Sequence, residues 1–316
     1  MRFQVVGHRV VHGADRFSKA TVITPDVELA IQDAARLAPL HNPANLLGIR
    51  EAMKVFSCPH VAVFDTAFHT TMPPESYTYA IPLDLAAKHK IRKYGFHGTS
   101  YGFVMQQTAE RLGKRAEDLN AIICHLGNGA SMSCIRKGVC VDTTMGLTPL
   151  EGLVMGTRSG DVDPGVYTYL TQDMSPAEVD NLLNKASGLK GLCGHSDMQQ
   201  VIVAADAGEE NAQLALKVFR VRKYLGSYLV RLNGEVDAVV FTAGIGEHSA
   251  KVRTLACEGL ETLGIALDPA KNAHVSRSAG GVISAAHSHT KILVVPTDEE
   301  LAICLQSYEA AGLLNP

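Results

Sequence analysis

The architecture of the chain can be read outward from one segment, Asn120-Ala121-Ile122-Ile123-Cys124-His125-Leu126-Gly127-Asn128-Gly129-Ala130-Ser131. Its apolar first half predicts a buried strand over 120–125 that runs into a Gly-Asn-Gly turn. Residues 131–135 and 139–142 are expected to be partner strands. A strand, a glycine-rich hairpin and a returning strand can converge backbone N–H groups on a phosphate, although an ordinary hairpin fits these residues equally well.

Strand-like and helix-like segments alternate on either side of this hairpin. We expect strands at 3–12, 61–64, 236–241 and 292–295, and helices at 25–37, 42–55, 101–114, 175–185, 209–233 and 296–312. Such alternation indicates an α/β fold with strands buried between helices. The strand at 61–64 ends in Asp65, and a carboxylate at the tip of a buried strand is typical of a functional site.

Composition narrows the classes of protein to which the chain can belong. With 316 residues, 46% of them hydrophobic, it can bury a large core, and its length predicts two domains. The formal net charge is −3 and no long basic run is present, which argues against nucleic acid and anionic membranes as partners. No apolar run approaches the roughly 18 residues that span a bilayer.

The cysteine and histidine patterns point to a cytoplasmic protein without a structural metal. The segment from Met1 to His8 is too polar for a signal peptide. The seven cysteines are odd in number and scattered, with no Cys-x-x-Cys pair, so we expect small buried thiols in a reducing compartment. The thirteen histidines show no ligand spacing typical of a metallohydrolase.

One arginine, Arg158, stands in a setting that suits an oxyanion. The segment from Thr148 to Asp161 surrounds it with glycines and small hydroxyl residues. Glycine allows close backbone approach, and a guanidinium fork matches the oxygens of a carboxylate or phosphate. Segments 6–13, 94–100 and 125–131 have the same glycine-rich, polar character. Together the four segments predict a phosphoryl-transfer site.

Taken in order, these segments resemble the acetate kinases, members of the superfamily of sugar kinases, heat-shock ATPases and actin. The matching motifs are Gly7–Gly13, Pro39–Pro43, Phe64–His69, Phe96–Ser100, His125–Gly129, Gly156–Asp161, Phe241–Glu247 and Pro296–Glu300. The resemblance implies reversible phosphoryl transfer from ATP to acetate, giving ADP and acetyl phosphate, with Mg²⁺ or alternatively Mn²⁺ as cofactor. It also implies a homodimer.

The same resemblance implies two actin-like, ribonuclease-H-like domains around a cleft. We expect residues 1–67 with 302–316 to form the N-terminal domain and residues 68–301 the nucleotide-binding domain. Family members begin with a further strand and an Asn-x-Gly-Ser-Ser-Ser-x-Lys phosphate loop that precede the first matching motif. Since this sequence has neither, we expect its first domain to be truncated and destabilised and its activity to be weak or absent.

The resemblance also implies roles for individual residues. Arg9 and Arg158 would clamp the carboxylate and the moving phosphoryl group, and His97 would stabilise the transition state together with Arg158. Asp65 would be a catalytic residue that orients groups or helps to hold the metal, and Glu299 would bind the metal. Asp65 as a strand-end cap and His97 as a structural histidine remain open alternatives.

The remaining implied residues divide between the two substrates. The acetate pocket would be formed by Arg9, Val11, Leu40, His41, Phe96 and Pro149. The ATP site would be formed by His125, Leu126, Gly127, Asn128, Gly129, Asp197, Met198, Gln199, Gly244, Ile245, Gly246 and His248. One methylene changes binding in a small apolar pocket by only about 1–3 kcal/mol, so propionate is an alternative substrate.

Four positions depart from the family pattern. Tyr101 replaces a His, Gln199 an Arg, His248 an Asn and Asp298 an Asn. The adenosine side therefore diverges more than the carboxylate side, which leaves another phosphoryl donor such as pyrophosphate open. A different class of function is a nucleotide-binding remnant without catalysis, which the missing phosphate loop would favour.

Overall fold

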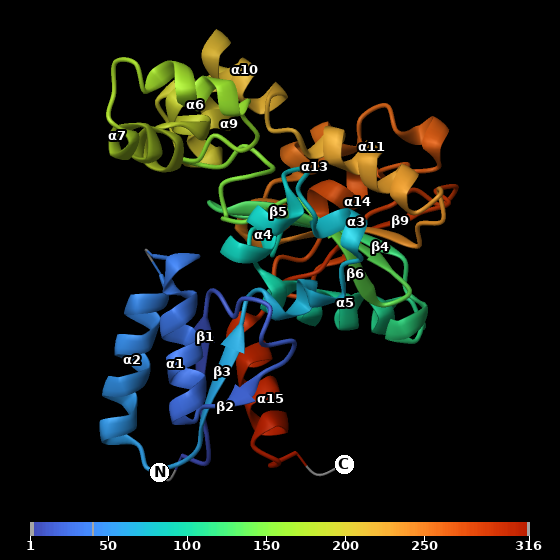
Figure 1. The fold of residues 1–316 in the computed structure, drawn as a ribbon. Coiled ribbons are helices and arrows are strands. Elements are labelled where there is room, and N and C mark those ends of the chain that lie inside the picture. Colours follow the sequence, from blue (N-terminus) through green and yellow to red (C-terminus); the bar gives the residue numbers. More distant parts are fainter. Residues whose placement is uncertain (1–2, 40, 315–316) are drawn as a thin grey trace.

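The computed structural model describes residues 3–39 and 41–314. A three-stranded sheet has the order β1 (Val6–Val10), β3 (His60–Phe64) and β2 (Thr21–Val22). β1 runs parallel to β3, and β2 is antiparallel to it. Helices α1 (Pro25–Asp33) and α2 (Asn42–Val55) lie on one side of this sheet, and α15 (Glu299–Ala310) lies on the other (Figure 1).

The larger sheet has six strands in the order β6-β5-β4-β7-β9-β8. Its strands are β4 (Ala121–Leu126), β5 (Ala130–Arg136), β6 (Val139–Thr143), β7 (Ala238–Thr242), β8 (Gly281–Val282) and β9 (Lys291–Val294). β4, β7 and β9 are parallel, whereas β5, β6 and β8 join by antiparallel pairing.

The central strands of this sheet are buried on both faces. Ile123 and Val240 pack with residues of α5 (Gly98–Arg111) on one face. Ile122 and Val239 pack with residues of α11 (Val221–Arg231) on the other. Successive side chains of a strand point to opposite faces, so a strand covered on both sides reads as a continuous apolar run.

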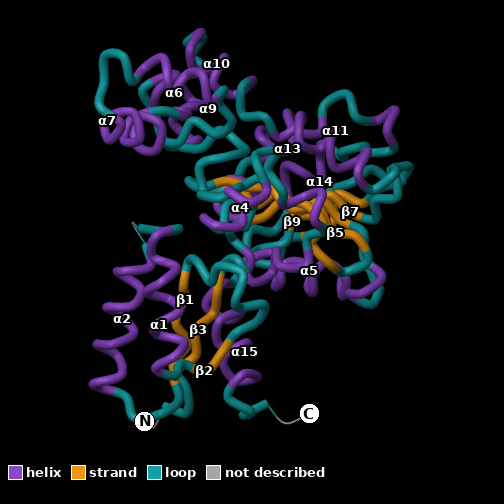
Figure 2. The backbone as a smooth tube through the Cα atoms, in the orientation of Figure 1, coloured by secondary structure: helices purple, strands orange, loops and turns teal. Residues whose placement is uncertain are grey.

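Most of the remaining helices cover this sheet or form a separate helical lobe (Figure 2), whereas α4 (Leu83–His89) has no buried residue. The others are α3 (Pro74–Tyr77), α6 (Pro164–Leu170), α7 (Pro176–Asn181), α8 (Gly188–Cys193), α9 (Met198–Asp206), α10 (Glu210–Lys217), α12 (Ala243–His248), α13 (Ala250–Cys257) and α14 (Pro269–His274). The lobe consists of α6 to α10 and connects β6 to α11.

Several helices differ from their predicted extents; α1 ends at Asp33, α7 at Asn181, and α15 begins at Glu299. The helix expected at 209–233 is divided into α10 and α11, because Arg220 adopts a left-handed conformation with φ 65°. This turn lets Phe219 enter the core, where it is 5% exposed. Helix α5 begins at Gly98, three residues before the predicted start at 101. The segment with Gly244 and Gly246, expected to bind ATP, is helical, since α12 starts at Ala243.

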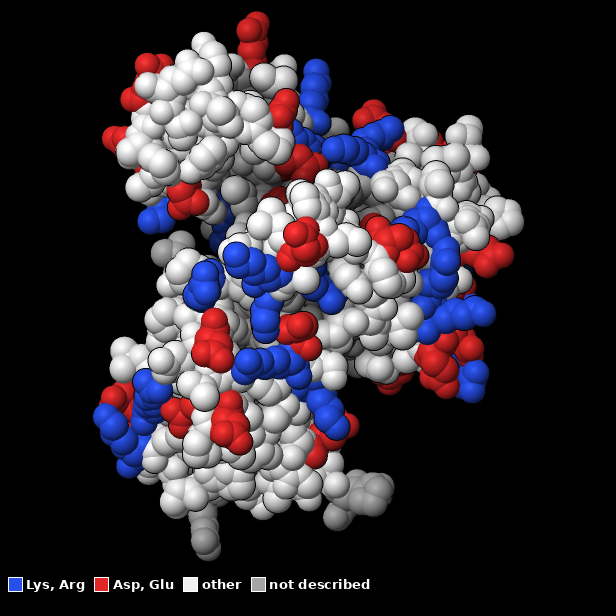
Figure 3. Space-filling view, in the orientation of Figure 1, with Lys and Arg blue, Asp and Glu red and all other residues white. Residues whose placement is uncertain are grey.

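The surface shows no field of a single sign on the face drawn in Figure 3, where basic and acidic residues are interspersed. The same view shows a hollow between the lobe of α6–α10 and the layer of α1 and α2. Among the helices of the described residues, none is long and apolar enough to cross a membrane. We propose that the two sheets form the cores of the two domains expected from the sequence.

Candidate active site

The Gly-Asn-Gly hairpin between β4 and β5 lies at the centre of the candidate site. Its turn is closed by a hydrogen bond from the Gly127 N–H to the Gly129 carbonyl at 3.2 Å. A Cβ atom placed on Gly129 would lie 3.6 Å from both Arg158 Nη1 and His97 Nε2. Two side-chain nitrogens from distant parts of the chain therefore face this turn, an arrangement suited to an anionic tetrahedral group.

Arg158 is half-buried and forms no ion pair with a carboxylate of the described residues. Its Nη1 donates to the Pro149 carbonyl at 3.2 Å and contacts Met155 Sδ at 3.7 Å. The loop that carries Arg158 is held against the hairpin by the Gly156 N–H, which donates to the Asn128 carbonyl at 3.1 Å. Burial lowers the pKa of Arg158. An uncompensated guanidinium in such surroundings gains from binding an anion.

A second guanidinium, Arg9 of β1, is fixed by a carboxylate at the end of β3. Arg9 Nε donates to Asp65 Oδ1 at 3.1 Å, and Nη2 donates to Oδ2 at 2.7 Å. Burial raises the pKa of Asp65, while the charge of Arg9 opposes the rise. Glu299, in the first turn of α15, places Oε2 at 3.9 Å from Arg9 Nε. Its pKa is raised by burial. Two carboxylates thus flank one guanidinium.

Two imidazoles stack beside the hairpin. The rings of His97 and His125 have centroids 4.1 Å apart and planes 16° apart. His97 Nδ1 lies 2.8 Å from Ser131 Oγ, and His125 Nδ1 lies 2.9 Å from Ser100 Oγ. Burial lowers the pKa of His97 well below its usual range and that of His125 to about 4. Both rings are therefore neutral near pH 7.

The backbone around His97 explains how its ring reaches this position. His97 adopts φ 60°, a left-handed conformation that non-glycine residues rarely take, immediately before α5. The next residue, Gly98, donates its N–H to the Asp65 carbonyl at 2.9 Å. Any side chain at Gly98 would collide with that carbonyl. The start of α5 is thereby tied to the end of β3, which brings the histidines next to the Arg9–Asp65 pair.

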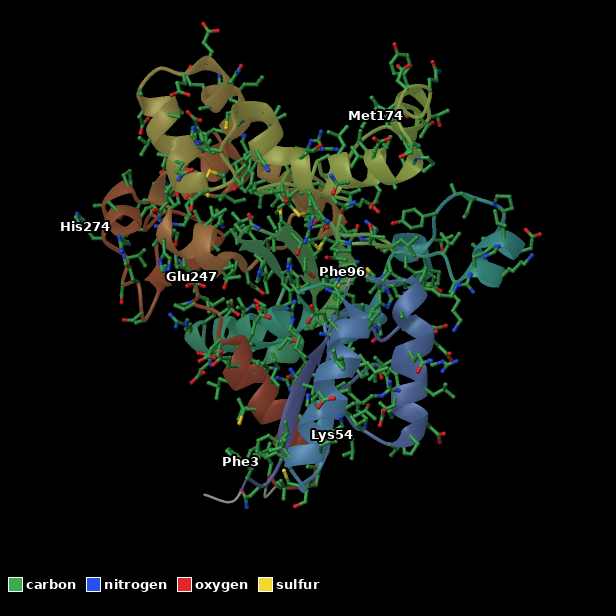
Figure 4. The ribbon with its side chains drawn as sticks, turned by 90° about the vertical axis from the view of Figure 1, so that its left-hand side faces the viewer. Phe3, Lys54, Phe96, Met174, Glu247 and His274 are labelled. Atoms are coloured by element: carbon green, nitrogen blue, oxygen red, sulfur yellow. The ribbon has the colours of Figure 1, made fainter. Side chains whose placement is uncertain are left out.

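Of the predicted acetate-pocket residues, His41 lies near the two arginines, and Val11 and Phe96 lie in an apolar cluster. His41 precedes α2, and its pKa is lowered by burial and then by the charges of Arg158 and Arg9. Val11 and Phe96 belong to one buried apolar cluster. Figure 4 shows Phe96 where the N-terminal layer meets the strands of the larger sheet. Leu40 lies outside the described residues. The structure therefore brings apolar surface and guanidinium groups together at one junction.

The predicted ATP-site residues fall into two groups around the hairpin. His125 and Leu126 are buried at the end of β4, directly before the turn. On one side a Cβ on Gly127 would lie 3.8 Å from Ala243, so α12 with Gly244, Ile245, Gly246 and His248 begins next to the turn. Of these residues, Gly244 and His248 are exposed, whereas Gly246 is buried.

On the other side of the hairpin lies the start of α9. A Cβ on Gly156 would lie 2.9 Å from the Ser196 carbonyl, which places this segment beside the Arg158 loop. Asp197 caps α9 by accepting from the Gln199 N–H at 2.6 Å. Asp197 and Gln199 are exposed, while the Met198 side chain is 3% exposed and packs in the core. Met198 therefore contributes its side chain to the core, whereas Asp197 and Gln199 face the surface.

Comparison with known proteins agrees with this geometry. The sequence profile of the acetokinase family matches residues 1–305. The chain belongs to the acetokinase family. It is 53% identical to the acetate kinase of Streptomyces avermitilis over 312 residues, which cover 97% of this chain and 76% of that protein. This membership confirms the family expected from the motifs.

Two solved structures of the acetokinase family resemble this fold closely. The crystal structure of Porphyromonas gingivalis acetate kinase matches with a TM-score of 0.93 and 43% identity, covering 98% of this chain and 78% of that one. That of a propionate kinase from Francisella tularensis matches with a TM-score of 0.91 and 46% identity, covering 97% and 79%. The α/β, two-domain actin-like fold predicted from the sequence is therefore confirmed.

As a member of the acetokinase family, the chain is a phosphotransferase, and its site contains polar residues that the sequence analysis did not assign. Ser131 contacts His97, and Ser100 contacts both His125 and Thr297, at 2.8 Å for the latter pair. The Thr297 N–H donates to Glu247 Oε1 at 3.0 Å. The signal in the sequence is weak: Ser100 and Ser131 come two residues after a glycine and Thr297 follows Pro296, which is common for ordinary turn residues as well.

Proposed function

We propose that this chain transfers the γ-phosphoryl group of ATP reversibly to acetate, giving ADP and acetyl phosphate. The observation that carries the proposal is the convergence of Arg158 Nη1 and His97 Nε2 on Gly129, each 3.6 Å from the position of its absent Cβ atom. Phosphoryl transfer needs cationic and N–H groups around the equatorial oxygens of the moving group. This site supplies both beside a turn of small residues.

Arg9 and Arg158 would each neutralise part of the negative charge of the two substrates. Arg158, which pairs with no carboxylate among the described residues, would contact the transferring phosphoryl group. Arg9, oriented by Asp65 through two hydrogen bonds, would bind the acceptor carboxylate or the phosphoryl group opposite. A carboxylate is already deprotonated and nucleophilic at neutral pH, so the site requires no strong general base. Asp65 accordingly acts by holding Arg9 in place.

A divalent ion is expected for the family, and we propose Mg²⁺ with Mn²⁺ as an alternative. The described residues contain no cluster of three or more metal ligands. Mg²⁺ often binds through one or two carboxylates, with phosphate and water completing its shell. Glu299 fits this role, because its carboxylate is partly exposed and its nearest cation lies 3.9 Å away. A bound ion would neutralise charge on the phosphates, whereas Asp65 is already engaged by Arg9.

Acetate and propionate are the two acceptor candidates. Val11, 7% exposed, and Phe96, 2% exposed, belong to one apolar cluster and stand close in sequence to Arg9 and His97 of the candidate site. A methyl or an ethyl group suits such a surface, and one extra methylene changes binding by only about 1–3 kcal/mol. The resemblance to a solved propionate kinase at 46% identity supports propionate as the second acceptor.

We also propose a homodimer that works in the cytoplasm. Three side chains of α6 are notably exposed for apolar residues: Val166 at 40%, Tyr167 at 38% and Tyr169 at 70%. Grouped exposed apolar side chains are typical of protein interfaces. Four of the seven cysteines are buried, which supports a reducing compartment, whereas Cys58 and Cys193 are partly buried and Cys304 is exposed, contrary to the buried thiols expected from the sequence. Sedimentation of the protein with Tyr169→Glu, compared with Leu29→Glu on α1, tests whether α6 forms the interface.

The deciding experiment measures acetyl phosphate formed from acetate and Mg-ATP by the chain, trapped with hydroxylamine. Parallel reactions contain propionate, or pyrophosphate in place of ATP. Arg158→Ala should abolish turnover, while Arg50→Ala, which removes an exposed arginine of α2, should preserve it. Nucleotide binding without any turnover would instead support the binding-only alternative and refute the proposed activity of this chain.

A further inference from the structure

A buried pair of hydroxyl groups, those of Tyr101 and Ser131, contacts the Nδ1 side of His97, whereas Nε2 faces Gly129. We propose that Tyr101 and Ser131 are positioning residues that hold His97 in the tautomer with its proton on Nε2. This nitrogen is the one that faces Gly129 and Arg158, so the inference deepens the proposed phosphoryl-transfer function and rests on it. Neither hydroxyl would touch the substrates.

Three groups form a continuous hydrogen-bonded row. Ser131 Oγ lies 2.8 Å from His97 Nδ1 and 2.5 Å from the Tyr101 hydroxyl oxygen. Tyr101 and Ser131 are both 0% exposed. The row is built by local geometry, because the Tyr101 N–H donates to the His97 carbonyl at 3.0 Å in the first turn of α5. Residues four positions apart lie on the same face of a helix, so both side chains reach Ser131.

The Tyr101 ring has little freedom to leave this row. It packs edge-on against His69, with centroids 5.6 Å apart, and stacks on Phe68 at 6.0 Å. A third contact, edge-on to His125 at 6.1 Å, closes the aromatic cluster. Because buried aromatic side chains in contact occupy one rotamer, the hydroxyl is held at a fixed point.

The number of protons in the row determines which group donates in each hydrogen bond. Each hydroxyl carries one proton, and a neutral imidazole carries one on either nitrogen. If Tyr101 donates to Ser131 and Ser131 donates to Nδ1, both hydroxyl protons have acceptors, and the imidazole proton lies on Nε2, which faces Gly129 in the candidate site. If Nδ1 carries the proton instead, it donates to Ser131, and then either the Tyr101 or the Ser131 proton is left without an acceptor among the described residues.

An unpaired buried donor costs about 1–3 kcal/mol, so the first arrangement dominates. The pKa values of Tyr101 and His97 favour the same arrangement. Burial raises the pKa of Tyr101 well above its usual range, which keeps the phenol protonated as a donor. Burial and the neighbouring His125, Arg9 and Arg158 lower the pKa of His97. A neutral ring that accepts at Nδ1 must carry its proton on Nε2, where it can donate to a phosphoryl oxygen.

The sequence position makes Tyr101 informative, since it stands one helical turn after His97 at a site where the motif departs from the family pattern. In the favoured arrangement the phenol is the donor to Ser131, which leaves the Ser131 proton free for Nδ1.

The test begins with the tautomer itself. The protein is labelled with ¹⁵N-histidine, and the His97 signals are assigned by subtraction of the spectrum of His97→Gln. The expected spectrum of the unsubstituted protein shows a protonated Nε2 and an unprotonated, hydrogen-bonded Nδ1. A protonated Nδ1 would overturn the proposal, whether or not the chain is active as an acetate kinase. The tautomer measurement therefore distinguishes failure of the positioning proposal from failure of the proposed function.

Kinetics supply the second arm. Ser131→Ala should lower kcat about 10–100-fold and Tyr101→Phe about 3–10-fold, with KM for acetate changed less than about threefold, because the lost donor acts in the transition state. The matched control is Tyr228→Phe, which removes a buried hydroxyl with no hydrogen-bond partner among the described residues. It should leave kcat unchanged. Equal kcat values for Ser131→Ala and the unsubstituted protein would refute the positioning role.

Discussion

Arg9 and Asp65 meet in a two-point contact in which the carboxylate side chain is 2% exposed and the guanidinium side chain 47%. Arg9 lies on β1 opposite Val63 of β3, and Asp65 follows β3 directly. The carboxyl ends of parallel strands meet at one edge of a sheet, which is where α/β proteins bind ligands. The pair therefore presents a guanidinium of fixed orientation at that edge.

We expect Arg9→Lys to lower kcat/KM for acetate about 10-fold or more. An ammonium group keeps the charge but cannot make both contacts to Asp65, so the orientation is lost. Arg50→Lys is the matched control, because Arg50 pairs with Glu28 at 3.0 Å on the exposed surface of α2. Steady-state kinetics with varied acetate check the difference. Equal values for the two variants would contradict the orienting role of the Arg9–Asp65 pair.

Replacement by methionine should lower catalytic activity at Arg158 and stability at Arg253. Arg158→Met should reduce kcat about 100-fold or more while changing the free energy of unfolding by less than about 1 kcal/mol, because it removes a half-buried charge that pairs with no carboxylate of the described residues. Arg253 is 2% exposed and donates to Asn272, Gly246 and Glu247 at 2.7–2.9 Å. Its replacement leaves several buried acceptors unpaired.

Arg253→Met should accordingly cost about 3 kcal/mol or more of stability. Urea denaturation monitored by circular dichroism, together with the acetyl phosphate assay, distinguishes the two arginines. If Arg158→Met proves the more destabilising of the two, Arg158 serves the fold and the assignment to the active site loses its basis.

Gly129→Ala should inactivate the enzyme without unfolding it. The added methyl would make ordinary contacts of 3.6 Å with Arg158 Nη1 and His97 Nε2, so the fold tolerates it, but it fills the space between these groups that the phosphoryl oxygens need. We expect kcat to fall about 10-fold or more. Gly48→Ala, in the open middle of α2, should instead stabilise the protein by about 0.5–1 kcal/mol with full activity. Melting curves and initial rates of both variants provide the comparison.

Stability should fall as the pH is lowered from 6.5 to 4. Burial lowers the pKa of His12, His69 and His125 from 6.5 to about 4. Between these values the unfolded chain binds protons that the folded protein does not, so the stability present above pH 6.5 is lost on acidification. Each histidine contributes at most about 1.4 kcal/mol per pH unit. Urea midpoints at pH 7.5 and 5.0 test this, and identical midpoints would show that these rings are not buried in neutral form.

Much of the fold follows from local patterns. The strand at 61–64 and the helix at 42–55 are found at His60–Phe64 and Asn42–Val55, because an apolar run bounded by polar residues and an Asn-Pro start are strong local signals. The break in the predicted helix 209–233 was missed. Its cause is the burial of Phe219 in the core, which is a tertiary gain that local propensity does not encode.

The class of fold, the family and the segments that carry the chemistry can be predicted from the amino-acid sequence, because they depend on periodicity, glycine placement and short motifs. Which side chains meet depends on how the chain packs in three dimensions. Arg9 and Asp65 are 56 positions apart, and His97 and Ser131 are 34 positions apart. Such contacts arise where strand pairing and helix packing bring distant segments together, and a hydroxyl such as Ser131 acquires its role only from the imidazole placed 2.8 Å away.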